Sequence, residues 1–163
     1  MRTLTNADIE QSLKELRVYG YTSIPGYLNP SEVQKYRDLV NLHWDARRHT
    51  EFKGRPEREL TDKMVYGLQK RDKAFIDLLD AEGLVQILMA NLNDPYYKHL
   101  PPDMPNYILG FYNARSSGAE LALHTDTFVP SPGDRTWTMQ ASFFLEDSRV
   151  DNGCTILVRS LGE

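Results

Sequence analysis

The feature that most constrains the fold of this chain is a change in hydrophobic period near Pro105. Before Pro105, apolar residues recur at helical spacing, and after it they alternate with polar residues. The clearest alternation runs from Thr136 to Glu146, where only Phe144 breaks the pattern. Successive side chains of a strand point to opposite faces, so one face of this segment packs on apolar neighbours while the other meets water or a polar cavity. The sequence therefore predicts an α+β chain, with helices first and antiparallel strands after them.

The bulk composition is that of one ordinary globular domain. We expect a single domain over residues 1–163, mainly helical over 1–105 and with strands over 106–163. The net charge of −4 argues against nucleic acid as the main partner, and no apolar run approaches the roughly 20 residues of a membrane span. The segment Met1–Asn6 lacks the apolar core of a signal peptide. Cys154 is the single cysteine, which excludes an internal disulfide and favours a reducing, cytoplasmic location.

Local signals mark the helices of the first part. Thr5 suits the N-cap of a helix that ends at Gly20. The run 29–32, Asn-Pro-Ser-Glu, predicts the start of a second helix with a capping box. Apolar residues between 75 and 92 predict one or two more helices, with Gly83 as a candidate break.

The strands are predicted by β-rich runs that lie between turn signals. Besides residues 136–146, these runs span residues 21–24, 107–112, 121–124 and 155–158. Turns are predicted at 113–118 and at 151–153, where Asp-Asn-Gly is a hairpin signal. A jelly roll has eight strands, and about four core strands are visible in this chain. We therefore expect the N-terminal helices to pack on an antiparallel, jelly-roll-like core that is incomplete.

His124 and Asp126 form a His-x-Asp pair at the end of an apolar run. In a strand, the side chains of residues i and i+2 point to the same face, so both can reach one divalent ion. Such a pair and a distant second histidine make the 2-His-1-carboxylate triad of non-haem iron oxygenases. A solvated or hydrogen-bonded pair shows the same spacing, so the motif alone leaves both interpretations open.

Other polar residues also have a structural and a functional interpretation. Basic side chains cluster at Arg47, Arg48, Lys53, Arg55 and Arg58. A solvated loop accounts for them, and a basic wall for an anionic substrate is the alternative. We interpret His43 as a packed residue of the second helix and His99 as an exposed residue of a proline-rich loop.

Three pieces of the chain, taken in order, form a pattern more specific than the His-x-Asp pair. The first is residues 20–28, Gly-Tyr-Thr-Ser-Ile-Pro-Gly-Tyr-Leu, followed by the helix start at 29–32. The second is Leu123–Thr127, which contains the His-x-Asp pair, and the third is Phe144–Asp147 leading into residues 151–158. Together they resemble the phytanoyl-CoA dioxygenase family of Fe(II)/2-oxoglutarate-dependent oxygenases, and their order and spacing cover most of the chain.

The resemblance implies a double-stranded β-helix, a cupin-like jelly roll, with Fe(II) bound by His124, Asp126 and a later histidine. It also implies 2-oxoglutarate as cosubstrate, with its far carboxylate bound by a later arginine. Alignment of the strands places Gln140 and Ser142 on the polar face that lines the cosubstrate pocket in the family. We therefore expect a dioxygenase that uses O2 to hydroxylate a small organic substrate while 2-oxoglutarate is decarboxylated to succinate. The alternative is a non-catalytic binding or interaction module on the same scaffold.

The chain departs from the family pattern after Asp126. No histidine follows Asp126, and the family's distal histidine and arginine have no counterpart before Glu163. The remaining histidines, all in the helical or loop part, are His43, His49 and His99. The chain is then a fragment or variant of an oxygenase, a natural short homologue that serves as a binding module, or one half of a site completed by a partner chain. We favour the first of these interpretations.

An incomplete roll has consequences for stability. It leaves an unpaired strand edge and an open core. We therefore expect this chain to be less stable than its length suggests, or to form a homo-oligomer through that edge. Sedimentation and thermal unfolding test this expectation. A monomer with a sharp, high unfolding midpoint would contradict it.

Overall fold

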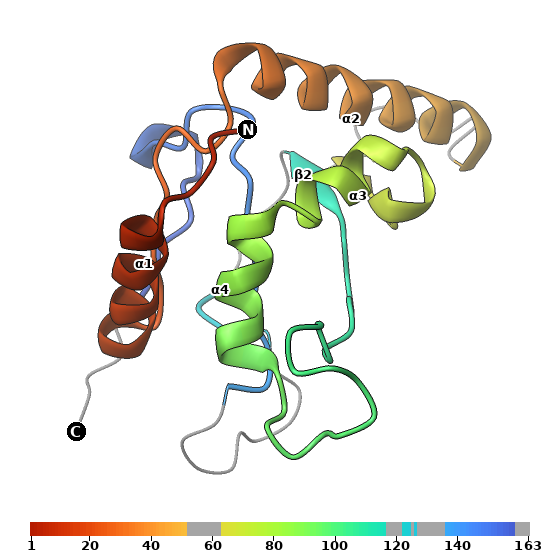
Figure 1. Ribbon diagram of the computed structural model, residues 1–163. Helices are drawn as coiled ribbons and strands as arrows, with labels where there is room; N and C mark the ends of the chain where they lie inside the picture. The colour runs from red at the N-terminus through yellow and green to blue at the C-terminus, as the bar shows by residue number, and fades with distance from the viewer. Residues whose placement is uncertain (52–62, 117–121, 125, 127–135, 159–163) are drawn as a thin grey trace.

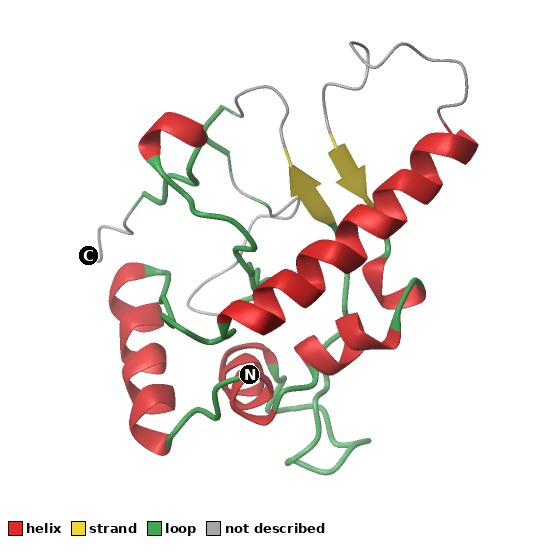
Figure 2. Cartoon of the chain, turned by 90° about the horizontal axis from the view of Figure 1, so that it is seen from above, coloured by secondary structure: helices red, strands yellow, loops and turns green. Residues whose placement is uncertain are grey.

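The computed structural model describes residues 1–51, 63–116, 122–124, 126 and 136–158, without the side chains of residues 48–51. Its helices are α1 (Asn6–Tyr19), α2 (Pro30–Glu51), α3 (Lys73–Leu79) and α4 (Glu82–Leu92), with short 3-10 helices η2 (Leu68–Lys70) and η3 (Val150–Asn152) (Figure 1). Its strands are β1 (Lys63–Val65) and β2 (Ala114–Ser116), and α2 runs beside them (Figure 2). The described part of the chain is therefore α+β. None of its helices is long and apolar enough to cross a membrane.

Helix α1 has the two ends that the sequence predicts. The Thr5 hydroxyl accepts a hydrogen bond from the Asp8 N–H at 3.2 Å, and the Asp8 carboxylate accepts one from the Thr5 N–H at 2.9 Å. This reciprocal pair is a capping box. At the other end Gly20 has a φ of 79°, and its N–H donates to the Leu16 carbonyl at 3.0 Å. Glycine suits this left-handed position because it has no Cβ.

Helix α2 also begins as predicted. The Asn29 side-chain oxygen accepts a hydrogen bond from the Glu32 N–H, and the Glu32 carboxylate accepts one from the Asn29 N–H, both at 2.9 Å. Pro30 occupies the first helical position, where the missing N–H is not needed. The helix then continues to Glu51. The start of α2 is thus defined by contacts among neighbouring residues.

The core lies between α2, α3 and the two strands. Phe75 of α3 is 2% exposed, and its ring lies 6.0 Å from Tyr36, 6.3 Å from His43 and 6.1 Å from Tyr112, measured between ring centroids. The Tyr36 hydroxyl donates to the Ala74 carbonyl at 3.2 Å. His43 is therefore a packed helix residue, as the sequence predicts.

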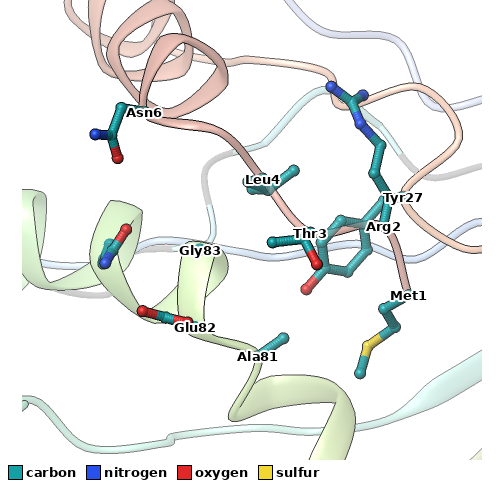
Figure 3. Close-up of a pocket in the computed structure, with 10 residues that line it drawn as sticks. Met1, Arg2, Thr3, Leu4, Asn6, Tyr27, Ala81, Glu82 and Gly83 are labelled. Carbon is teal, nitrogen blue, oxygen red and sulfur yellow. The ribbon is translucent and has the colours of Figure 1, made fainter.

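Gly83 does not break a helix but lies in the first turn of α4. Helices α3 and α4 are instead separated at Asp80 and Ala81. A Cβ on Gly83 would lie 2.7 Å from the Cβ of Leu4, a residue that is 8% exposed. Gly83 is thus required by the close approach of the N-terminal arm to α4, beside an open cavity of about 380 Å³ (Figure 3). None of the predicted site residues lines that cavity.

Strands β1 and β2 form an antiparallel pair that the sequence does not predict. Met64 lies opposite Arg115, and Val65 lies opposite Ala114. β2 falls within residues 113–118, so the predicted turn there is wrong. The physical reason is burial: Val65 is 1% exposed and packs in the core beneath α2, and such tertiary packing overrides local turn propensity.

The other predicted strands are not strands in the described residues. They are residues 21–24, 107–112, 122–124, 136–146 and 155–158. A strand is defined by N–H to C=O pairing with a neighbour, and hydrophobic alternation does not supply the neighbour. Several apolar side chains of these segments are accordingly exposed, among them Ile108 at 92%, Phe111 at 81% and Ile156 at 77%. The described residues do not form the jelly-roll core, which stays a prediction.

The chain does turn at residues 151–153, Asp-Asn-Gly, but the described residues on either side are not strands. The N–H groups of Asn152 and Cys154 both donate to the Arg149 carbonyl at 3.1 Å. Gly153 follows with a φ of 79°. The predicted turn is therefore confirmed as a turn closed around η3, and the hairpin is not seen.

Substitution of Gly83 by alanine tests the contact between the N-terminal arm and α4. The clash is with the Leu4 Cβ, which cannot rotate away, and overpacking of this kind costs about 1–3 kcal/mol. Alanine returns up to about 1 kcal/mol of helix propensity. We therefore expect Gly83→Ala to lower the free energy of unfolding by about 1 kcal/mol in urea titrations. Gly110→Ala is the control, because a Cβ there meets nothing within 4 Å. Unchanged or greater stability of Gly83→Ala would contradict the contact.

The capping box of α1 makes that helix sensitive to acid. Hydrogen bonds from the Thr5 N–H, the Thr5 hydroxyl and the Arg2 guanidinium lower the pKa of Asp8 below its ordinary value of 3.8. A carboxyl group whose pKa is lowered by folding contributes stability above its unfolded pKa, and this contribution is lost as the pH falls through the folded pKa.

Asp8→Asn should therefore lower the unfolding midpoint at neutral pH, and the difference from the parent chain should shrink as the pH falls below 3.8. Thermal unfolding followed by circular dichroism across acidic pH measures this difference. Glu10→Gln, on the same helix but outside the cap, is the control. A difference that persists unchanged in acid would rule out the cap as its source.

Candidate metal centre

His124 and Asp126 lie together in the structure. The His124 Nε2 and the Asp126 Oδ1 are 3.3 Å apart, and the two side chains are 54% and 64% exposed. Two ligand atoms held roughly 2.1 Å from one ion, about 90–105° apart, would be separated by about 3.0–3.3 Å. The observed separation therefore suits a shared ion. The two residues do not lie on a strand within the described residues.

The other ring nitrogen of His124 points to its tautomer. Nδ1 lies 2.7 Å from the Ala122 carbonyl oxygen. A carbonyl oxygen only accepts hydrogen bonds, so Nδ1 carries the proton and donates it. A neutral imidazole has one N–H, which leaves the Nε2 lone pair facing the Asp126 carboxylate. A backbone carbonyl that orients a metal-binding histidine in this way is common in metal sites.

Two acceptors at 3.3 Å repel each other unless a positive charge lies between or beside them. A second proton on the imidazole satisfies this requirement and gives a hydrogen-bonded ion pair. A divalent cation bound by both atoms satisfies it as well. The arrangement thus fits two ligands of a metal ion, and it equally fits the hydrogen-bonded pair left open by the spacing.

A third ligand is not found among the described residues, where no three His, Cys, Asp or Glu side chains are grouped to bind a metal. His43 is packed against Phe75 in the core, 6.3 Å between ring centroids. His99 is exposed in the loop after α4, with its ring 5.4 Å from that of Tyr97. The side chain of His49 lies outside the described residues. The site as described therefore supplies one imidazole and one carboxylate.

Gln140 and Ser142 are exposed on the segment 136–146. Phe143 and Leu145 of the same segment are half-buried and pack against the core. The alternation predicted by the sequence thus survives around Ser142, although the segment is not a strand. The assignment of Gln140 and Ser142 to cosubstrate binding stays a prediction.

The basic cluster of the sequence is mostly outside the described residues. Arg47, the member whose side chain is described, donates to the Met64 carbonyl and lies with its guanidinium 4.7 Å from the ring centroid of Tyr66. These contacts fasten α2 to β1, so they favour a structural role for Arg47.

Sequence reasoning missed Arg37. Its guanidinium donates to the Leu145 carbonyl, with Nε at 3.1 Å, and so joins α2 to the segment that carries Ser142. A signal was present, since Arg37 follows Val33 by four residues and precedes Val40 by three. A charged residue in the apolar stripe of a helix needs a partner, and this one finds it in a backbone carbonyl.

Comparison with known proteins identifies the family. The family model described as phytanoyl-CoA dioxygenase (PhyH) matches residues 16–160. No match was found among curated proteins or among solved structures. The matched range includes His124, Asp126, Gln140 and Ser142 and covers most of the chain. The chain therefore belongs to the phytanoyl-CoA dioxygenase family.

Proposed function

We propose that the protein is an Fe(II)/2-oxoglutarate-dependent dioxygenase in which His124 and Asp126 are two of the iron ligands. Family membership supports this class of chemistry. The observation that carries the proposal is the contact between His124 Nε2 and Asp126 Oδ1 at 3.3 Å, because this separation suits two ligands of one ion. Both side chains are more than half exposed, so an ion can reach them from solvent.

Each residue of the pair has a distinct task. The Ala122 carbonyl holds the imidazole of His124 with Nδ1 as donor, which presents the Nε2 lone pair to the ion. The carboxylate of Asp126 neutralises part of the ion's charge. When bound, Fe(II) supplies the redox chemistry by which O2 decarboxylates 2-oxoglutarate to succinate and hydroxylates a C–H bond of a small organic substrate. Gln140 and Ser142, exposed on one segment, contribute polar groups to the cosubstrate side.

The proposal requires a third protein ligand that the described residues do not provide. An iron with six positions can hold three protein groups, the two oxygens of a keto acid and O2. With only two protein ligands, binding would be weak and would not orient the cosubstrate. The second candidate function, a non-catalytic binding module on the same scaffold, needs no third ligand.

Calorimetric titration of Co(II) into the protein, with and without 2-oxoglutarate, tests the proposal. Loss of an outer-shell partner already weakens metal binding about 10–100-fold, so loss of a ligand in His124→Ala should weaken it at least as much. His99→Ala is the matched control, since His99 is an exposed loop histidine outside the site. We expect 2-oxoglutarate to tighten metal binding in the parent chain and in His99→Ala.

Two results separate the candidate functions. Tight binding that depends on His124 and is enhanced by 2-oxoglutarate, with succinate formed when Fe(II) and O2 are present, supports the dioxygenase. Equal Co(II) affinity in the parent chain and His124→Ala, with no effect of 2-oxoglutarate and no succinate, would overturn it in favour of the binding module.

A further inference from the structure

The turn around η3 contains the residue pair Asn152–Gly153, and no other asparagine of the chain is followed by glycine. In this pair a peptide nitrogen readily attacks the side-chain amide of the asparagine, because glycine has no Cβ to obstruct the approach. Both residues are exposed in the turn, which is the blue helical segment of Figure 1. The pair is therefore a candidate for a covalent modification that needs only water.

The peptide nitrogen that would attack is free of hydrogen bonds. The N–H groups on either side of it, those of Asn152 and Cys154, both donate to the Arg149 carbonyl at 3.1 Å. The N–H of Gly153 donates to no group in the described part of the chain. Gly153 also has a φ of 79°, which residues with a side chain rarely adopt. The nucleophile thus has no bond to break before it reacts.

The side-chain amide of Asn152 is held by two hydrogen bonds. Its Oδ1 accepts from the Arg149 N–H at 2.7 Å, and its Nδ2 donates to the Asp147 carbonyl at 2.6 Å. Little packing supports these bonds, since the side chain of Asp147 is 87% exposed and Val150 is 93% exposed. A segment with so few buried contacts opens locally at low cost. Each opening frees the amide beside an unbonded nucleophile.

We propose that Asn152 is a site of spontaneous deamidation and that the reaction prevents the turn from closing again. The Gly153 nitrogen forms a bond to Cγ of Asn152 while the Cγ–Nδ2 bond breaks. The proton of the Gly153 N–H passes through solvent to the departing Nδ2, which leaves as ammonia. Water then opens the cyclic imide at either carbonyl and gives aspartate or its β-linked isomer. This inference is independent of the function proposed above.

The product cannot make the contacts of the amide. A carboxylate only accepts hydrogen bonds, so an oxygen in place of Nδ2 would face the Asp147 carbonyl oxygen at 2.6 Å with no proton between them. The new negative charge also joins Asp147 and Asp151, which already share Arg149. The bond from the Arg149 N–H can remain. Deamidation therefore removes one of the two side-chain bonds that hold the turn and replaces it with a repulsion.

Peptide mapping by mass spectrometry tests the modification in folded protein kept at mildly alkaline pH. We expect the peptide that contains Asn152 to accumulate the acid form first. Asn29 is the internal control, because its Oδ1 also caps a helix, accepting from the Glu32 N–H at 2.9 Å, while Pro30 has no N–H and cannot act as the nucleophile. Loss of the Asn152 amide no faster than that of Asn29 would overturn the inference.

Thiol labelling of Cys154 measures the state of the turn, because the Cys154 N–H helps to close the turn and the residue is half-buried. Asn152→Asp supplies the product directly. We expect this variant to speed labelling of the folded protein about threefold to tenfold, the change in local opening that loss of one hydrogen bond produces.

Asn113→Asp is the matched control for the added charge. The Asn113 side chain accepts from the Gly67 N–H at 3.3 Å, and a carboxylate keeps that acceptor. We expect its Cys154 to react at the parent rate. Labelling of Asn152→Asp at the parent rate, or an equal increase in both variants, would overturn the effect of deamidation on the turn.

Discussion

The packing of α2 over Phe75 is the interaction on which the rest of the structure depends. The Phe75 ring meets side chains from α2 and from the approach to β2, so one buried aromatic group joins segments far apart in the chain. The same helix fastens β1 through Arg47 and the C-terminal segment through Arg37. Because α2 begins at its own capping box, a local signal at Asn29 defines the start of the element that organises the long-range contacts.

The helices could be predicted from sequence because their ends are coded within a few residues. Thr5 and Gly20 bound α1 by hydrogen bonds that span no more than four positions. Gly83 shows the limit of such reasoning, since its glycine is required by Leu4, a residue remote in sequence. The predicted strands are not seen in the described residues for a related reason, because a strand needs a neighbour that is remote in sequence. Alternation shows which face of a segment is apolar, and Phe143 accordingly lies inward, but it does not show which segment lies alongside.

The candidate site likewise has one feature that the sequence predicts and others that it does not. The proximity of His124 and Asp126 follows from their spacing, although the strand invoked for it is not seen in the described residues. The proton on His124 Nδ1 depends on a local backbone conformation that brings the Ala122 carbonyl, two residues away, within 2.7 Å, and the spacing does not reveal that conformation. Arg37 was visible in the sequence as a charge in an apolar stripe, but its partner is a backbone carbonyl, and a carbonyl has no sequence signal.

The core and the site differ in how completely their polar groups are satisfied, and this difference bears on how the protein would respond to a cation. Beneath α2, the hydroxyl of Tyr112 and the Nε2 of His43 are buried without a hydrogen-bond partner in the described structure, and burial raises the pKa of Tyr112. Such groups reduce stability whether or not a ligand is present. The opposition of His124 and Asp126 is instead removable, because a bound ion turns two repelling acceptors into ligands. Under the proposed function, metal binding therefore stabilises the segment that carries His124 and Asp126, and folding of that segment is linked to occupancy of the site.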